Sequence, residues 1–243
     1  EIGLVGKYVE LKDAYKSILD SFINAGAENE YKVNVRSIHS ENITDKNVDT
    51  LLDGLNGVLV APGFGQRGIE GKITAIRWAR ENKVPFLGIC LGMQCAVVEF
   101  GRNVLGFDKA HSTEFDADTS FPVIDLMEGQ RSVDDKGGTM RLGAYPCTID
   151  KKSKAFGVYN VQDIRERHRH RYEFNNKYLD DYRDAGMLPV GINPNENLVE
   201  MIELPDHPWF IGVQFHPEYK STVAKPHPLF VSFVQACIKQ SKS

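Results

Sequence analysis

Apolar and polar positions in the first part of the chain predict strands and helices that take turns. Short apolar runs predict buried strands over residues 2–5, 32–38, 57–60 and 86–89. Apolar residues spaced three and four apart predict helices over residues 13–25, 48–55, 69–81 and 94–100. Because a strand, a helix and a further strand in succession form right-handed crossovers, we expect a mostly parallel sheet with helices on both faces.

The pattern changes after Gly101, where strand-like segments follow one another with fewer helices between them. These strands are predicted over residues 121–126, 140–149 and 197–203. We expect them to form a small antiparallel extension, with a mobile surface loop over 125–139, which is rich in Asp, Gly and charge. An apolar strand over 209–215 and a helix over 228–239 complete an α/β, flavodoxin-like fold, predicted as one domain over residues 1–243.

Composition excludes several classes of protein. Lys and Arg total 29 against 33 for Asp and Glu, which gives a net charge of -4, and no basic stretch alternates with aromatics. We therefore expect no nucleic-acid partner. No apolar run approaches the roughly 20 residues of a membrane span, so we expect no membrane partner.

The four cysteines lack the spacing of a disulfide framework or of a Cys-x-x-Cys metal pair. They indicate a reducing, cytoplasmic setting and no metal site. The chain begins with Glu1 and runs directly into a predicted strand, so we expect a domain that is part of a longer protein.

The most informative stretch is Gly88-Ile-Cys-Leu-Gly92, where a cysteine stands between a predicted strand and a predicted helix. Glycines on both sides remove the Cβ atoms that would clash across so sharp a corner, as in a nucleophile elbow. A helix N-terminus next to Cys90 favours the thiolate. An arbitrary cysteine is more often a buried structural residue, and that is what we predict for Cys95, Cys147 and Cys237.

A base for Cys90 is predicted at His216, which also follows directly on an apolar strand. Glu218 lies two positions on and is placed to orient the imidazole. A lone His-Pro-Glu often only caps a strand end, but together with the elbow it indicates acyl transfer through a thioester. Such chemistry needs backbone N–H donors for an oxyanion, which Gly63 and Leu91 are placed to supply. The glycine loop at residues 62–68 alternatively predicts a phosphate cradle or a plain turn, although it lacks a P-loop ending.

Two motifs resemble the class I (triad) glutamine amidotransferases: Gly88-Ile-Cys-Leu-Gly-Met-Gln94 and Val213-Gln-Phe-His-Pro-Glu218. Further motifs resemble more closely the glutaminase domains of the CTP synthase family. They are Val5-Gly-Lys-Tyr-Val-Glu-Leu-Lys-Asp-Ala-Tyr15, Gly63-Phe-Gly-Gln-Arg-Gly-Ile-Glu-Gly-Lys72, Ser112-Thr-Glu-Phe115, Met140-Arg-Leu-Gly143 and Glu166-Arg-His-Arg-His-Arg-Tyr-Glu173.

The resemblance implies hydrolysis of L-glutamine to glutamate and ammonia, with Cys90 as nucleophile, His216 as base and then acid, and Glu218 as its orienter. Gly63 and Leu91 would carry the oxyanion N–H groups. Four residues match those that hold the amino and carboxylate ends of glutamine, or lie next to them: Gln94, Glu114, Arg171 and Tyr172. A carboxylate such as Glu114 suits an α-ammonium, whereas Arg171 lies in a run otherwise typical of a solvated face.

The resemblance also implies partners. Ammonia would pass to a synthetase domain, absent from this chain, that amidates UTP using ATP and Mg, in a full-length homo-oligomer. No cofactor is expected in the glutaminase domain itself. Four residues would face the synthetase domain and an activating GTP: Lys7, Arg67, Gly68 and Glu70.

The chain departs from the family pattern at Pro62, where a glycine is common. Proline has no N–H and cannot be an oxyanion donor, which leaves the amide of Gly63. Two alternatives remain open. A γ-glutamyl hydrolase shares the elbow but takes larger substrates, and a noncatalytic binding module would keep the fold without turnover.

Overall fold

The structure, a computed structural model, describes residues 1–9, 13–126 and 140–242. The predicted loop over 125–139 begins within strand β6 (Phe121–Leu126), and residues 127–139 lie outside the described part of the chain. None of the described helices is long and apolar enough to cross a membrane.

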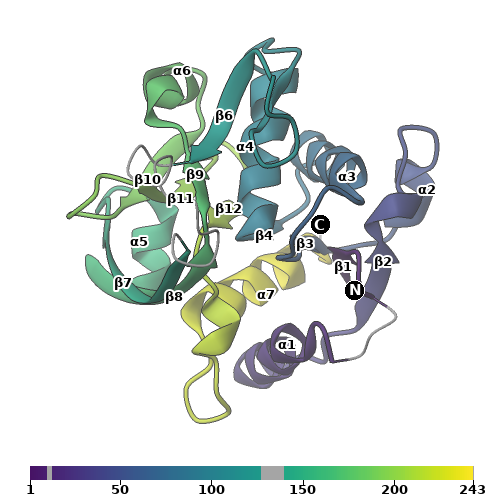
Figure 1. Cartoon of the computed structure of the whole chain (residues 1–243). Coiled ribbons are helices and arrows are strands. Elements are labelled where there is room, and N and C mark those ends of the chain that lie inside the picture. The colour runs from purple at the N-terminus through teal and green to yellow at the C-terminus, as the bar shows by residue number, and fades with distance from the viewer. Residues whose placement is uncertain (10–12, 127–139, 243) are drawn as a thin grey trace.

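The main sheet has nine strands in the order β2-β1-β3-β4-β12-β11-β10-β7-β8. The first five run parallel: β2 (Val35–His39), β1 (Ile2–Gly6), β3 (Gly57–Val60), β4 (Phe86–Ile89) and β12 (Phe210–Val213). Strand β12 therefore lies beside β4 although most of the chain separates them in sequence (Figure 1). The carboxyl ends of these two strands share one edge of the sheet.

The remaining strands of the main sheet pair antiparallel. They are β11 (Val199–Glu203), β10 (Leu188–Ile192), β7 (Arg141–Ile149) and β8 (Asp163–His170). A separate sheet of three strands contains β5 (Ala110–Ser112), β6 and β9 (Tyr172–Phe174). The expected α/β fold is confirmed, with an antiparallel part that supplies four of the nine strands.

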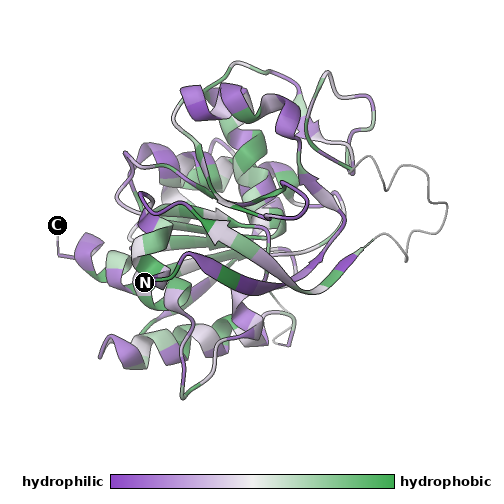
Figure 2. Cartoon of the chain, turned by 90° about the vertical axis from the view of Figure 1, so that its left-hand side faces the viewer, coloured by the Kyte–Doolittle hydropathy of each residue, from purple (hydrophilic) through white to green (hydrophobic). Residues whose placement is uncertain are grey.

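Helices cover both faces of the main sheet and divide the core in two. On one side lie α1 (Lys16–Glu28), α5 (Lys154–Tyr159) and α7 (Pro228–Gln240); on the other lie α2 (Val48–Leu52), α3 (Ile69–Glu81) and α4 (Leu91–Asn103) (Figure 1). Helix α6 (Leu179–Asp184) and three short 3-10 turns, Ser40–Asn42, Asn176–Tyr178 and Pro217–Tyr219, complete the described elements. Figure 2 shows hydrophilic residues on the outer helix surfaces and hydrophobic ones along the central strands, as a sheet covered by helices on both faces requires.

Helix α4 is buried on every side from Leu91 to Gly101. It packs against β4 and β12 of the main sheet and against β5 and β6 of the small sheet. A helix between two sheets has little solvent face, which explains why its sequence is mainly apolar, with Gln94 and Glu99 as buried exceptions. The residue that precedes α4 is Cys90, so the nucleophile predicted from sequence stands on the most enclosed helix of the fold.

Strand β8 was not predicted, because its alternation is not one of apolar and polar residues. Its inward positions are Ile164, Glu166, His168 and His170, all buried, while the residues between them are exposed. Charged inward side chains make the strand look solvated throughout, and the prediction of a solvated face is wrong for these positions. Strand β10 was missed because Pro189 and Gly191 interrupt it, and its register with β11 shifts there.

The contact between α4 and β3 gives a test of the fold. A Cβ at Gly92 would lie 2.2 Å from the carbonyl oxygen of Val60, a backbone atom that cannot move aside. We predict that Gly92→Ala lowers the free energy of unfolding by about 2–3 kcal/mol, measured by urea denaturation. The matched control is Gly157→Ala in α5, whose Cβ meets nothing within 4 Å and which should be neutral or up to about 1 kcal/mol more stable. Equal unfolding midpoints for Gly92→Ala and wild type would contradict the packing described.

Candidate active site

Cys90 stands in the sharp turn between β4 and α4 with a backbone φ of 52° and ψ of -105°, a conformation that residues with a Cβ rarely adopt. Two glycines permit the turn. A Cβ at Gly88 would lie 2.8 Å from the carbonyl carbon of Gly92, and Gly92 itself presses against Val60. The structure therefore contains the strained strand-to-helix corner predicted from the glycine spacing.

The thiol of Cys90 lies in surroundings that favour a thiolate. Cys90 is 4% exposed and precedes the first residue of the thirteen-residue helix α4, whose N-terminal dipole attracts negative charge. The side-chain amide of Gln214 donates to Cys90 Sγ at 3.6 Å. Both the helix and this donor stabilise sulfur in its charged form.

His216 reaches the site from the end of β12. The register pairs Val213 with Ile89, and Cys90 N–H donates to the carbonyl of Val213 at 2.7 Å, so both strand ends are held together. His216 Nδ1 is 2.7 Å from Glu218 Oε1, and both side chains are buried. The carboxylate therefore fixes the ring orientation and leaves Nε2 available, as an orienting acid does.

The imidazole of His216 interacts electrostatically with the thiol. Burial alone would lower the pKa of His216, but charge interaction and hydrogen bonding with Cys90, followed by those with Glu218, raise it to about 11. Nε2 forms no fully aligned hydrogen bond with any described residue. The imidazolium form of His216 is therefore favoured next to the thiol, and such catalytic contacts are often loosely aligned before substrate binds.

A cavity of about 150 Å³ opens above the thiol. Its lining contains Cys90 and all six residues predicted to contact substrate, together with three that were not predicted. The lining residues are Gly63, Phe64, Cys90, Leu91, Gln94, Glu114, Met140, His170, Arg171 and Tyr172. Gly63 and Leu91 approach one another across it, since a Cβ at Gly63 would lie 3.8 Å from Leu91 Cδ2. The two residues whose amides are predicted to form an oxyanion hole thus both line the cavity that contains the thiol.

The side chain of Gln94 is held in one orientation. Its Nε2 donates to the carbonyl of Tyr172 at 3.0 Å and to Oε1 of Gln214 at 3.2 Å. Both amide hydrogens are therefore used inside the protein, and the oxygen is the atom left to accept a hydrogen bond from a ligand. The same two bonds join α4 to β9 and to the segment after β12.

Glu114 and Arg171 bring opposite charges to the cavity. Burial raises the pKa of Glu114, while the backbone amide of Gly65 and the charge of Arg171 act in the opposite direction. Arg171 is half-buried in the corner between β8 and β9, and its Nε forms no hydrogen bond with a described residue. The cavity therefore offers a carboxylate and a guanidinium to one small ligand.

The four residues expected at a domain interface differ in burial. Lys7 is buried, and its Nζ donates to the carbonyl of Phe64 in the glycine loop. Gly68 has a φ of 73° at the start of α3, where a Cβ would lie 2.1 Å from Ser40 Oγ. Arg67 and Glu70 are exposed. Lys7 and Gly68 thus hold the loop in shape, and Arg67 and Glu70 are available to a partner.

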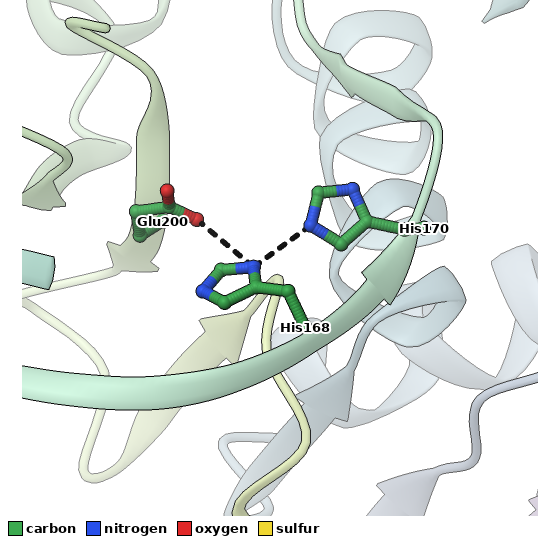
Figure 3. A group of neighbouring side chains, drawn as sticks. All are labelled: His168, His170 and Glu200. Carbon is green, nitrogen blue, oxygen red and sulfur yellow. Dashed lines mark hydrogen bonds and ion pairs between the residues drawn. The ribbon is translucent and has the colours of Figure 1, made fainter. Parts of the chain in front are cut away.

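A second cluster of buried polar side chains lies behind the cavity on β8 and β11. Figure 3 shows His168, His170 and Glu200, the one group among the described residues spaced closely enough to suit a metal ion. Some of their polar atoms bond within the protein, whereas His168 Nε2, His170 Nδ1 and Glu200 Oε2 form no hydrogen bond with a described residue. Arg141 donates to Glu200 at 2.9 Å and to Glu173 at 3.0 Å, and His168 Nδ1 lies 2.8 Å from His170 Nε2.

Charge and protonation in this cluster favour a structural role. Burial lowers the pKa of His168 to about 3 and that of His170 well below its usual range, with the charge of Arg141 acting in the same direction. A cation placed here would meet the guanidinium that already neutralises Glu200. We therefore assign the cluster to fixing the β8–β9 corner that carries Arg171 and Tyr172.

Sequence reasoning missed Gln214, although it lies within the motif that ends in His216 and Glu218. The signal was the position of Gln214, which directly follows β12 as Cys90 directly follows β4. Met140 and His170 could not have been assigned to the cavity, because strand β8 was not predicted. The remaining cysteines are buried and free, as expected, and burial raises the pKa of Cys95 to about 12.

Comparison with known proteins gives a family match over most of the chain. The family model for class-I glutamine amidotransferases matches residues 10–236. The CTP synthase of Christiangramia forsetii is 67% identical over 240 residues, which are 99% of this chain and 44% of that protein. The CTP synthase of Clostridium acetobutylicum is 57% identical over 242 residues, 99% of this chain and 45% of that protein. The chain thus spans about half the length of the curated relatives it matches.

Two solved structures resemble this chain over nearly its whole length. The Trypanosoma brucei CTPS glutaminase domain with bound acivicin has a TM-score of 0.91 at 37% identity, covering 98% of this chain and 93% of that one. A glutamine amidotransferase from Thermotoga maritima has a TM-score of 0.55 at 11% identity, covering 100% of this chain and 98% of that one, and shows likeness of the fold alone.

The interaction between Cys90 and His216 can be measured directly. We predict that Cys90→Ala lowers the pKa of His216 from about 11, because it removes the group that raises it most, and that Glu218→Gln also lowers it. NMR titration of the histidine side chains tests both variants. His207, whose burial lowers its pKa to about 4, is the internal control and should not change. An unchanged pKa of His216 in Cys90→Ala would show that the thiol and imidazole are not paired.

Proposed function

The chain belongs to the class-I glutamine amidotransferases, and within them to the glutaminase domains of CTP synthases, and from this we propose that its cavity hydrolyses L-glutamine to glutamate and ammonia. The observation that carries the proposal is the cavity itself, in which the Cys90 thiol lies beside one carboxylate and one guanidinium. Free glutamine has an α-ammonium and an α-carboxylate to match them. We propose that Glu114 and the Gln94 oxygen accept from the ammonium, and that Arg171 binds the carboxylate with Tyr172 beside it.

The proposed reaction has two halves. Sγ of Cys90 attacks the side-chain amide carbon, and the N–H groups of Gly63 and Leu91 stabilise the oxyanion that forms. His216, held by Glu218, donates a proton to the departing nitrogen, so ammonia leaves and a glutamyl thioester remains. His216 then accepts a proton from water, which attacks the thioester and releases glutamate.

We propose that the ammonia serves a synthetase domain in a longer, homo-oligomeric protein. The CTP synthase relatives are about twice as long as this chain, and the chain is proposed to be one domain of such a protein. The partner domain would amidate UTP to CTP using ATP and Mg, and no cofactor is proposed for the glutaminase domain. The exposed Arg67 and Glu70, with Lys7 and Gly68 shaping the loop beside them, would face that domain and an activating GTP.

The size of the cavity favours glutamine over larger γ-glutamyl substrates. Its volume of about 150 Å³ suits one amino acid, whereas pockets for larger ligands usually exceed about 300 Å³. The alternative of a noncatalytic module is disfavoured by the paired Cys90, His216 and Glu218.

Kinetics on the purified chain test the proposal. We predict release of ammonia from free glutamine, with a kcat/KM at least about tenfold above that for γ-glutamyl peptides, because the rest of a peptide would not fit within the small cavity. We also predict that Arg171→Gln raises KM for glutamine about 10- to 100-fold, through loss of a charge-assisted bond to the carboxylate. The matched control is Arg165→Gln, in the same charged run but exposed and bonded to the carbonyl of Ala144, which should leave KM unchanged. Preference for γ-glutamyl peptides would identify the alternative hydrolase, and no turnover of either substrate would favour a binding module.

A further inference from the structure

A buried lysine lies beneath the glycine loop. Lys72, in the first turn of α3, is 2% exposed and is among the largest fully buried side chains of the protein. Its Nζ donates to the carbonyl oxygen of Ala61 at 2.7 Å. Ala61 follows β3 directly and lies two residues before Gly63, so this bond is made to the base of the loop that carries the proposed oxyanion donor.

Lys72 also approaches the loop itself. A Cβ at Gly63 would lie 3.9 Å from Lys72 Nζ and 3.8 Å from Leu91 Cδ2. The Lys72 ammonium therefore lies next to the backbone of Gly63, between α3 and the start of α4. It is not on the cavity lining, and Lys72 does not contact a bound ligand directly.

The ammonium has no acidic partner among the described residues. Burial lowers the pKa of Lys72 to about 8, the thiols of Cys95 and Cys90 act to raise it, and the charge of Lys7 acts to lower it. A buried ammonium is costly unless negative charge compensates it, and an apolar side chain of similar length would fill the same space at lower cost. Of the two neighbouring thiols, Cys95 resists ionisation because burial raises its pKa to about 12. Cys90 is the one whose other neighbours favour the thiolate.

We propose that Lys72 is a positioning residue, whose ammonium holds the Ala61–Gly63 segment and favours the Cys90 thiolate from beneath. A role for Lys72 in catalysis rests on the proposed glutaminase function, whereas its effect on the Cys90 thiolate does not depend on that function. Other charged or polar groups facing the thiol come from different elements: Gln214 and His216 after β12, Glu114 and Arg171 across the cavity, and Lys7 at the end of β1. Lys72 reaches the site through the protein interior, from α3.

Protonation gives the proposal a defined pH window. Below about pH 8 Lys72 is charged and favours the thiolate, and above that pH its charge and its influence are lost. Removing the charge should therefore slow thiolate reactions at lower pH and leave them unchanged at higher pH. A lysine that acted only as a hydrogen-bonded pin would instead affect the reaction to the same extent at every pH.

The test is alkylation of Cys90 by iodoacetamide as a function of pH, with the modified peptide quantified by mass spectrometry. Lys72→Gln keeps an N–H donor but removes the charge, and Lys72→Met removes both. We predict that Lys72→Gln moves the rising part of the pH profile toward higher pH by about one unit, so that alkylation on that part slows about tenfold while the plateau at high pH is retained. Lys46→Gln, on an exposed lysine, is the matched control and should leave the profile unchanged.

Each result of the alkylation experiment either supports or overturns the proposed role of Lys72. A Lys72→Gln profile that coincides with wild type would overturn the proposal, as would a uniform slowing at every pH. If Lys72→Met fails to fold by circular dichroism, Lys72→Gln alone remains decisive. Because iodoacetamide needs no substrate pocket, a shifted profile in a chain that does not hydrolyse glutamine would uphold the role of Lys72 while rejecting the proposed function.

Discussion

The parallel pairing of β4 with β12 is the contact on which the rest of the site depends. It places Ile89 opposite Val213, so the residues that follow each strand, Cys90 and Gln214, emerge side by side from one sheet edge. The N–H of Cys90 closes this edge by donating to the carbonyl of Val213. Segments that lie far apart in sequence thus bring Cys90 and His216 to one place, as open parallel sheets do with their ligand sites.

Around that edge the protein buries an unusual number of polar groups, each of which restrains a part of the site. Glu218 orients His216, Gln94 links α4 to β9, and the ion pairs of Arg141 with Glu173 and Glu200 fix the corner before Arg171. Buried ion pairs add little net stability, since desolvation offsets their attraction. Their value here is geometric, because they leave the cavity few alternative conformations and hold its charged side chains in place before a ligand arrives.

Much of this architecture is predictable from local pattern, and the rest fails for identifiable reasons. The strand over 57–60, the helix over 69–81 and the elbow at Cys90 follow from apolar spacing and from glycines at which a Cβ would meet backbone atoms. Strand β8 could not be found this way, since its buried face consists mainly of Glu166, His168 and His170, whose partners, such as His227 for Glu166 and Glu200 for His168, lie on other elements. Hydropathy describes what a residue prefers, whereas burial of these three depends on ion pairs that exist only after folding.

The residues of the site also divide into those that can be predicted from the sequence and those that cannot. Cys90 and His216 were predicted because each follows a recognisable strand, and Glu218 because it lies two residues after His216; the structure places His216 beside both Cys90 and Glu218. The oxyanion amides and Lys72 are harder to recognise, because backbone N–H groups have no sequence signature and a single lysine at the start of a helix looks solvated.

The most direct test of the central claim is mass spectrometry of the chain after reaction with a diazoketone derived from glutamine, which combines an electrophile with the α-ammonium and α-carboxylate that the cavity is proposed to bind. The account predicts a single adduct on Cys90, suppressed by excess glutamine, with Cys95, Cys147 and Cys237 unmodified. An unlabelled Cys90, or labelling that glutamine does not suppress, would contradict it.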